Sequence, residues 1–295
     1  MYELIHAAER TYYIDCPAKM GLYLENATDV WLIDSGNDKE AGKKIQKILT
    51  AQGWNLKAII NTHSNADHIG GNHLLQDRLG CPIYAKGIDA AFTRFPILEP
   101  SFLYGGYPCK ALRNKFLMAQ DSQVLELSTA PLPPGMEIID LPGHYFHMIG
   151  VKTPDNVWFL ADCLTSETII DKYHISFIYD VAAYLDTLDR IEQLEGASFI
   201  PSHAEAVPDI RPLARANRQK VLEIKEKLLA CCGEPLTFEE ILKRVFDDYG
   251  LTMDVNQYVL VGSTIRSYLS WLCDLGQLSV SFEDNRMLWK QRAAK

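Results

Sequence analysis

The chain has 295 residues, of which 47% are hydrophobic and 23% charged, and its formal net charge is −9. This balance is typical of a globular protein with a full core, and the length fits one large domain or a large domain plus a small one. The negative charge disfavours nucleic acid or an anionic membrane as a partner attracted by charge alone.

Cysteine usage and the N-terminus indicate a cytoplasmic protein. The seven cysteines are odd in number and contain no C-x-x-C pair, so we expect reduced thiols and not a disulfide framework. The first residues carry acidic side chains and no continuous apolar core, unlike a signal peptide. No apolar run approaches membrane-spanning length.

The first sixty residues predict three short strands, a helix and a further strand. Turn residues separate the strands, and Gly53 ends a helix whose apolar residues recur on one face. The predicted elements are strands ending at Ile14, over Gly21–Glu25 and over Val30–Ile33, a helix from Asn37 or Asp38 to about Gln52, and a strand over Leu56–Ile60.

The loop after this last strand is dense in candidate metal ligands. Its sequence, NTHSNADHIGGNH, places His63, Asn65, Asp67 and His68 within six residues. Imidazoles and carboxylates are the groups that hold zinc or iron. The Gly-Gly pair that follows lets a helix begin close against a sheet. The alternative is a polar loop in which Asp67 caps a helix.

A long irregular segment follows at residues 94–115. We expect a helix from about Asp67 to Leu79 and a short strand at residues 81–84, after which three prolines and a Gly-Gly pair break the regularity. Long loops of this kind often have a function, so the segment predicts an insertion or a lid. Its candidate substrate contacts are Tyr104, Tyr107, Lys110, Arg113 and Lys115; the alternative for them is a solvated surface.

Three later strand ends each present another candidate ligand. Predicted strands over residues 137–141, 157–161 and 199–202 lead to His144, Asp162 and His203. Further strands are expected at residues 124–127 and 148–152, and a helix from about Asp180 to Glu195. Loops at one edge of a sheet bring distant residues together, so this recurrence carries more weight than a single histidine.

After about residue 212 the predicted elements change from strands and helices in alternation to a run of helices. We expect helices over residues 214–230, 237–249 and 255–275, the last broken near Gly262, and then a hairpin around Asp284-Asn285. This order is similar to a winged helix. From Leu213 onward, however, the chain has 12 basic and 11 acidic residues, and the candidate recognition segment holds one arginine. Core packing, a subunit contact or a wall of the active site is therefore favoured over DNA reading.

Together, these motifs resemble the metallo-β-lactamase superfamily of metal-dependent hydrolases. The resemblance covers residues 1 to about 210 and rests on Asp34 after a strand, His63-Ser-Asn-Ala-Asp-His68, His144 in PGH, Asp162 in FLADC and His203 in PSHAE. It implies an α+β fold, an αββα sandwich with a dinuclear metal centre at one sheet edge. We predict a catalytic domain over residues 1–212 and a small, mainly α domain over 213–295. The C-terminal helices resemble the extension of a glyoxalase II-like, hydrolase-like branch.

The resemblance also assigns the ligands, with one departure. His63 and His144 would hold a first metal, Asp67, His68 and His203 a second, and Asp162 would bridge them. The family has histidine where this chain has Asn65, whose amide is a weak donor that could coordinate poorly, hold a water or leave the first site empty. His147 is a candidate substitute or supporting residue, Asp34 is expected to organise the loops, and His174 is a candidate substrate contact.

The leading expectation is a hydrolase that uses a metal-activated water on an ester, thioester, lactone or phosphodiester of a small molecule, with Asp67 as the catalytic carboxylate. Zinc is expected, as one or two ions, with iron or manganese as alternatives. One rival is an iron-dependent redox enzyme, because the superfamily's flavodiiron reductases also replace that histidine, by glutamate. Another is a binding protein with a degenerate site. The sequence leaves the oligomeric state open, with a homodimer as one option.

Overall fold

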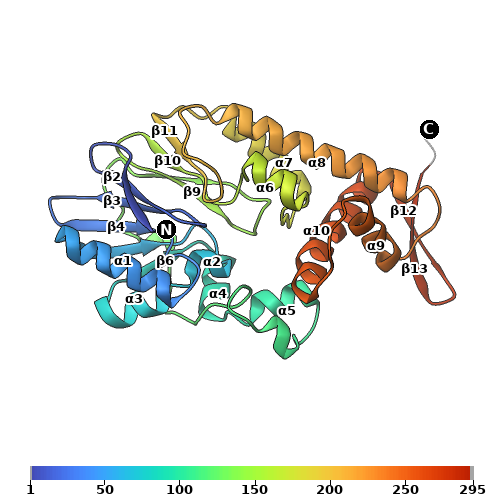
Figure 1. Ribbon diagram of the computed structural model, residues 1–295, viewed down its shortest axis with the longest axis horizontal. Coiled ribbons are helices and arrows are strands. Elements are labelled where there is room, and N and C mark those ends of the chain that lie inside the picture. Colours follow the sequence, from blue (N-terminus) through green and yellow to red (C-terminus); the bar gives the residue numbers. More distant parts are fainter. Residues whose placement is uncertain (1, 293–295) are drawn as a thin grey trace.

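Two β-sheets form the centre of the computed structural model, which describes residues 2–292 (Figure 1). The first sheet has seven strands in the order β1-β2-β3-β4-β5-β6-β7, antiparallel up to β4 and parallel from β4 onward. The second has four strands in the order β11-β10-β9-β8. The strands are β1 Glu3–His6, β2 Thr11–Asp15, β3 Met20–Leu24, β4 Asp29–Ile33, β5 Asn55–Ile60, β6 Ile83–Ala85, β7 Leu125–Glu126, β8 Glu137–Asp140, β9 Ile149–Lys152, β10 Val157–Phe159 and β11 Ser198–Ile200.

Helices cover the outer faces of both sheets. The first sheet carries α1 and α3, and the second carries α7 and α8 (Figure 1). The helices are α1 Lys39–Gln52, α2 Ala66–Ile69, α3 Asn72–Leu79, α4 Ile88–Arg94, α5 Leu98–Tyr104, α6 Glu167–Tyr173, α7 Val181–Ile191, α8 Arg211–Cys231, α9 Phe238–Asp248 and α10 Val255–Asp274, with short 3-10 turns at Lys110–Leu112 and Leu127–Thr129. This is the predicted αββα sandwich.

Alternate side chains of β4 pack into two different layers. Trp31 and Ile33 pack into the core between the sheets, whereas Val30 and Leu32 pack toward the helices of the first sheet. Successive side chains of a strand point to opposite faces, so a strand buried on both faces reads as a continuous apolar run. The apolar run at residues 30–33 therefore belongs to a central strand.

Several predicted elements differ in detail. The first predicted strand is two strands, β1 and β2, joined by a tight turn at residues 7–10. Helices α4 and α6 were not predicted from the sequence. Helix α1 has the expected cap, because Asp38 accepts hydrogen bonds from the backbone N–H groups of Glu40 and Ala41, and Gly53 ends it in a left-handed conformation.

The single helix predicted after the ligand-rich loop is interrupted at the Gly70-Gly71 pair. A Cβ on Gly70 would lie 2.3 Å from the carbonyl carbon of Asn37, and one on Gly71 would lie 2.4 Å from the carbonyl oxygen of Ser35. The glycines thus allow the close approach that the sequence suggested, but against the segment that joins β4 to α1 and not against a strand.

We expect a Gly70→Ala variant to lose about 3 kcal/mol of unfolding free energy, because an added methyl group would overlap backbone atoms that cannot rotate away. Urea denaturation measures this loss. Gly106→Ala is the matched control, since the nearest atom to its Cβ is 3.9 Å away. Equal stability of the two variants would contradict the close approach.

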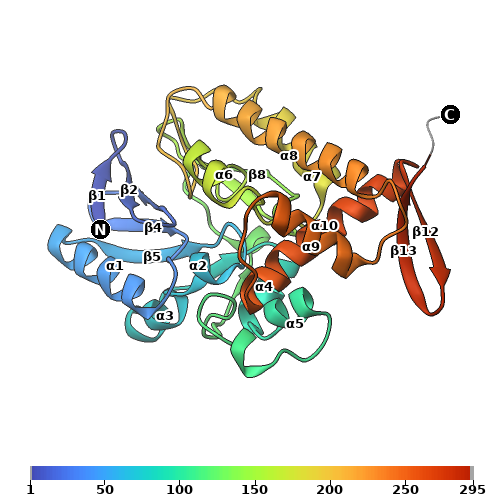
Figure 2. The same cartoon turned by 45° about the vertical axis from the view of Figure 1, so that its right-hand side comes forward.

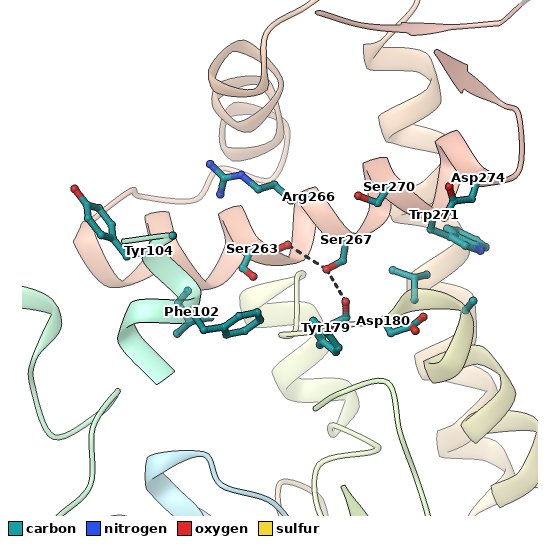
Figure 3. A pocket seen from close by; sticks show the side chains of 14 residues that line it. Phe102, Tyr104, Tyr179, Asp180, Ser263, Arg266, Ser267, Ser270, Trp271 and Asp274 are labelled. Atoms are coloured by element: carbon teal, nitrogen blue, oxygen red, sulfur yellow. Dashed lines mark hydrogen bonds between the residues drawn. The ribbon is translucent and has the colours of Figure 1, made fainter. Parts of the chain in front are cut away.

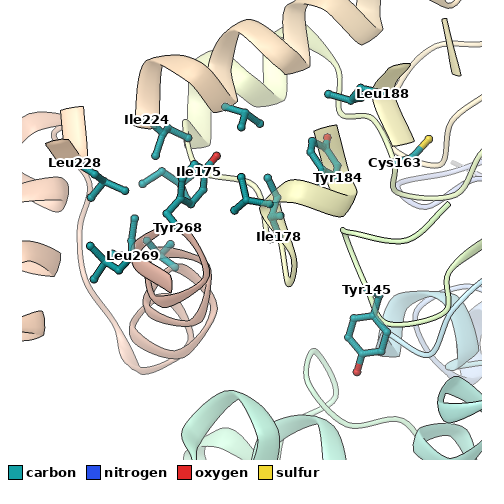
Figure 4. Packing of buried hydrophobic residues seen from close by; sticks show 14 of the residues in the cluster. Tyr145, Cys163, Ile175, Ile178, Tyr184, Leu188, Ile224, Leu228, Tyr268 and Leu269 are labelled. Carbon is teal, nitrogen blue, oxygen red and sulfur yellow. The ribbon is translucent and has the colours of Figure 1, made fainter. Parts of the chain in front are cut away.

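The C-terminal helices share one apolar core with the second sheet's outer layer. Figure 4 shows Ile224 and Leu228 of α8 packed with Tyr268 and Leu269 of α10, beside Ile178 that precedes α7. Thr237 and Glu240 form the predicted capping box of α9. Helix α10 runs unbroken through Gly262, contrary to the expected break.

A two-stranded hairpin, β12 Leu278–Glu283 and β13 Arg286–Gln291, ends the described chain and stands apart from both sheets (Figure 2). Its turn residues, Asp284 and Asn285, both have positive φ, as the two-residue turn of a tight hairpin requires. The division near residue 212 and the likeness to a winged helix stay predictions. Among the described residues, no helix is long and apolar enough to cross a membrane.

Candidate metal centre

The loops that follow five strands meet at one edge of the sandwich. Backbone hydrogen bonds join them: Asp34 N–H donates to Ile60, Ile149 N–H to Thr62, and Ser202 N–H to Ala161. This places the loops after β4, β5, β8, β10 and β11 side by side. The six side chains predicted as ligands come from four of these loops and converge: His63, Asp67, His68, His144, Asp162 and His203.

Within residues 2–292 the ligand atoms form two groups that share Asp162. One group is His63, His144 and Asp162; the other is Asp67, His68, Asp162 and His203, and the atoms of each lie within 4.8 Å of one another. Asp162 is central, with Oδ1 3.0 Å from Nε2 of His68 and Oδ2 3.1 Å from Nε2 of His203. This is the arrangement expected of two neighbouring metal positions bridged by a carboxylate.

All four imidazoles use Nδ1 for a hydrogen bond outside the centre. His68 donates to Asp34 Oδ2 (2.8 Å), His144 to the Phe177 carbonyl (2.9 Å) and His203 to the Pro17 carbonyl (2.8 Å). Nδ1 of His63 lies 3.1 Å from the hydroxyl of Thr62. Because Nδ1 carries the proton, each neutral ring directs the lone pair of Nε2 into the centre, as metal-binding histidines do.

Several polar atoms in the centre are buried without a protein hydrogen bond. They are Nε2 of His63, Nε2 of His68 and Oδ1 of Asp162. Buried polar atoms normally have partners, and leaving one unpaired costs about 1–3 kcal/mol. Ligand atoms bonded to one tetrahedral zinc at about 2.1 Å lie about 3.4 Å apart, close to the spacing seen here. The donor set therefore fits a divalent metal ion.

The carboxylates make the centre favourable for positive charge. Burial opposes the charged form of His203, but Asp162 and Asp67 outweigh it and raise its pKa to about 10. Burial likewise opposes the ionisation of Asp162, but His203 and His68 hold its pKa well below the usual range. Burial lowers the pKa of His63 and of His144, so these two rings are neutral and can offer the lone pair of Nε2 to a metal ion.

Asp34 supports the centre from outside. Its carboxylate accepts from the backbone N–H (2.8 Å) and hydroxyl (2.6 Å) of Thr62 as well as from His68. Its φ is 62°, and Ala161, next to Asp162, also has a positive φ of 50°. Non-glycine residues adopt this conformation at a cost, and such strain concentrates at functional sites. Asp34 thus joins the end of β4 to Thr62 and His68 in the loop and helix after β5.

Asn65 lies beside the first group. It occupies the N-cap position of α2, but its side chain makes no capping hydrogen bond. Its amide instead donates from Nδ2 to Oε1 of Glu99 (2.7 Å), and its Oδ1 lies 3.1 Å from Nε2 of His144. Asparagine is a favoured capping residue, so this different use of its side chain indicates a role in the centre.

A cavity of about 250 Å³ opens onto the centre. Asp67 is among its polar lining residues, and an apolar wall comes from α5, α10 and two loops. Lys115 contributes a positive charge and is paired with Asp38 at 3.0 Å. The lining residues are Asn37, Asn65, Asp67, Glu99, Leu103, Lys115, Phe116, Leu117, His144, Asp162, Phe177 and Leu260. Through Leu260, the C-terminal helices do form a wall of the site.

A family model described as the metallo-beta-lactamase superfamily matches residues 20–203, well over half of the chain. The chain belongs to the metallo-β-lactamase superfamily. It is 26% identical over 213 residues to the probable metallo-hydrolase YybB of Bacillus subtilis (strain 168), a match that covers 68% of this chain and 89% of that protein.

Two solved structures of similar fold extend through the C-terminal helices. A metallo-beta-lactamase family protein from Thermus thermophilus has a TM-score of 0.72 at 17% identity and covers 96% of this chain and 99% of its own. A beta-lactamase domain protein from Burkholderia ambifaria has a TM-score of 0.73 at 15% identity, with 98% and 94% covered. The helical C-terminal part is thus shared with other proteins of this fold.

Some candidates predicted from the sequence lie away from this metallo-β-lactamase centre. The ring of His147 accepts a hydrogen bond at Nδ1 from the backbone N–H of Ile88 (3.2 Å), and the backbone N–H of His147 donates to Oδ2 of Asp89 (2.9 Å). Its Nδ1 is thus engaged by the backbone, and the residue belongs to neither group of candidate ligand atoms. Asp89 also accepts two hydrogen bonds from Ser64, and burial raises its pKa to about 6.

Of the predicted substrate contacts, Lys115 lines the 250 Å³ cavity, and the others do not: Tyr104, Tyr107, Lys110, Arg113 and His174. Tyr104 lines a separate cavity of about 790 Å³ between α5, the start of α7 and α10 (Figure 3). Tyr107 is 74% exposed and accepts a hydrogen bond from Arg113. His174 stacks on Tyr249, the residue that follows α9, with ring centroids 4.7 Å apart. Proximity in sequence to the insertion or to Asp162 did not translate into proximity to the site.

Glu99, Phe177 and Leu260 line the cavity but were not predicted from the sequence. Glu99 stands in an apolar segment, Ile97-Leu98-Glu99-Pro100, four residues before Leu103, which lines the same cavity. An isolated acidic residue on an apolar helical face was the available signal. Phe177 and Leu260 read as ordinary apolar residues, and only the packing of the chain shows where they face.

Proposed function

We propose that this protein is a metal-dependent hydrolase that acts on an ester, thioester, lactone or phosphodiester of a small molecule. The observation that carries the proposal is the convergence of four imidazole Nε2 atoms on the carboxylates of Asp67 and Asp162, with every Nδ1 already hydrogen-bonded elsewhere. This geometry is typical of metal binding and serves no evident purpose in packing.

His63 and His144 would hold one ion, His68, His203 and Asp67 the other, and Asp162 would contact both. A bound divalent ion supplies a water of lowered pKa and polarises the oxygen of the bond to be cleaved. Zinc is the expected metal, with manganese and iron as alternatives. The oxygen ligands in both groups are compatible with all three.

The chain's own residues define the rest of the reaction. Asp67 faces the cavity, and His68 and His203 keep its pKa well below the usual range against the effect of burial. It is thus ionised and can orient a water by accepting a hydrogen bond from it, while its low pKa makes it a weak base. Leu103, Leu117 and Phe177 surround a small space suited to a compact acyl or phosphoryl group. Lys115 at its edge favours a substrate with a negative charge.

Metal analysis and a substrate panel test the proposal. We expect protein purified without added metal to contain zinc or manganese and to hydrolyse at least one thioester, lactone, ester or phosphodiester. Activity should vanish after chelation and return with the same metal. Iron with oxygen consumption would instead support the redox alternative, and protein that binds no metal at micromolar concentrations would contradict the proposal and favour a binding role.

A further inference from the structure

Glu99 is a buried acidic residue with an unusual partner. It is 4% exposed, and within residues 2–292 no lysine or arginine forms an ion pair with it. Its Oε1 accepts a hydrogen bond of 2.7 Å from Nδ2 of Asn65. A carboxyl group buried without a cation is costly, so its placement on α5 against the metal loop calls for a compensating role.

The bond to Glu99 sets the orientation of the Asn65 amide. With Nδ2 directed at Glu99, Oδ1 is directed at the first group of ligands and lies 3.1 Å from Nε2 of His144. The His144 ring donates from Nδ1 to the Phe177 carbonyl, so a neutral ring has a lone pair at Nε2. Two lone-pair atoms therefore face each other, and a shared cation is what would join them.

We propose that Asn65 and Glu99 act as one unit that completes the first metal position. Asn65 Oδ1 would be its third ligand beside His63 and His144, and Glu99 is a positioning residue that holds the amide with its oxygen inward. This inference rests on the proposed metal-dependent function. It explains how the chain dispenses with the third histidine: a buried acceptor orients and polarises a donor that alone would be weak.

The unit also changes which metal the position favours. An amide oxygen is a harder ligand than an imidazole nitrogen, and carbonyl and carboxylate oxygens suit manganese better than they suit zinc. The second position keeps two histidines and two carboxylates. We therefore expect the first position to discriminate less strongly in favour of zinc over manganese than a three-histidine position would.

Calorimetric titration of chelator-treated protein with zinc and with manganese tests the inference. We expect two binding steps in the natural chain. Asn65→Ala removes the proposed ligand, and Glu99→Ala removes the hydrogen-bond partner that holds it. Each should weaken one binding step by about 10- to 100-fold and leave the other step unchanged. The double variant should be no weaker than Asn65→Ala alone, because the two residues act through one contact.

Two further variants make the test specific. Glu99→Gln should lose less affinity than Glu99→Ala, because its amide oxygen can still accept from Asn65. Ser101→Ala is the control on the same helix and should bind both ions like the natural chain. Within the described residues its hydroxyl bonds only to the carbonyl of Ile97, the N-cap of α5. Circular dichroism verifies folding, and Glu99→Gln with Asn65→Ala carries the test if Glu99→Ala does not fold.

Each outcome decides a separate point. Two unchanged steps in Glu99→Ala would overturn the role of Glu99, and a single step in the natural chain would overturn the completed first position while leaving a mononuclear hydrolase intact. No binding at all would overturn the proposed function as well. In Asn65→His, we expect the ratio of zinc to manganese affinity at the affected step to rise about tenfold or more; an unchanged ratio would overturn the choice of an oxygen ligand.

Discussion

An Asp162→Ala variant is expected to lose metal from both positions and at least about 10³-fold in kcat/KM, because several kcal/mol of transition-state stabilisation depend on the bound ions. Asp162 is the one residue that both groups of ligand atoms share. Its two oxygens lie 3.0 Å from His68 and 3.1 Å from His203. Without it, four imidazoles would surround a neutral methyl group. Metal analysis after gel filtration and steady-state kinetics measure the two losses.

The matched control for this variant is Asp171→Asn, which alters an exposed aspartate on α6. It should keep the metal content and the activity of the natural chain. An Asp162→Ala protein that still held two ions would show that the histidines and Asp67 bind them without the carboxylate of Asp162. Such a result would refute the bridging role of the carboxylate.

Removal of metal is expected to lower the melting temperature by on the order of 10 °C. A ligand that binds only the folded chain stabilises it by about 4 kcal/mol when present at a thousand times its dissociation constant, and each kcal/mol is worth about 2–4 °C in a domain of this size. Here the effect has a structural cause, since within residues 2–292 Nε2 of His63, Nε2 of His68 and Oδ1 of Asp162 make no hydrogen bond.

Thermal unfolding followed by circular dichroism, before and after chelation and after re-addition of zinc or manganese, measures this shift. Asp162→Ala serves as the internal comparison, because its melting temperature should respond little to either treatment. The shift should also shrink as the pH falls, since protons compete with metal for the imidazoles. A melting temperature that ignores chelation and re-addition would mean that the centre contributes no stability through metal.

Local sequence was enough to locate most of the centre. His63, Asp67 and His68 are close in the chain, and the other three ligands each follow an apolar run that predicts a strand. Because strands of one layer end at a common edge, strand ends with histidine or aspartate indicate a shared site. The substrate-facing residues followed no such rule. Tyr104 and Tyr107 belong to the right segment, yet α5 directs Glu99 and Leu103, and not these tyrosines, to the cavity.

The contact that orients the Asn65 side chain could not be predicted from the local sequence. The sequence identifies it as a departure from the family's motif and offers three outcomes for it: weak coordination, a held water or an empty position. Its hydrogen bond to Glu99, 34 residues along the chain, has no local signature. A carboxyl group in an apolar helix becomes informative only when the helix is docked against the metal loop.

The sequence by itself therefore predicted the αββα sandwich, through its resemblance to the superfamily, and six candidate ligands whose side chains the structure brings together at one edge. Short-range patterns, such as apolar strand runs, helix caps and ligand types at strand ends, gave the elements and the motifs, and the resemblance carried by those motifs implied the sandwich. Only the tertiary structure decided which walls close the cavity, which tyrosines stay outside it and how Asn65 is held. Those features depend on contacts between segments far apart in the chain, and no periodicity encodes such contacts.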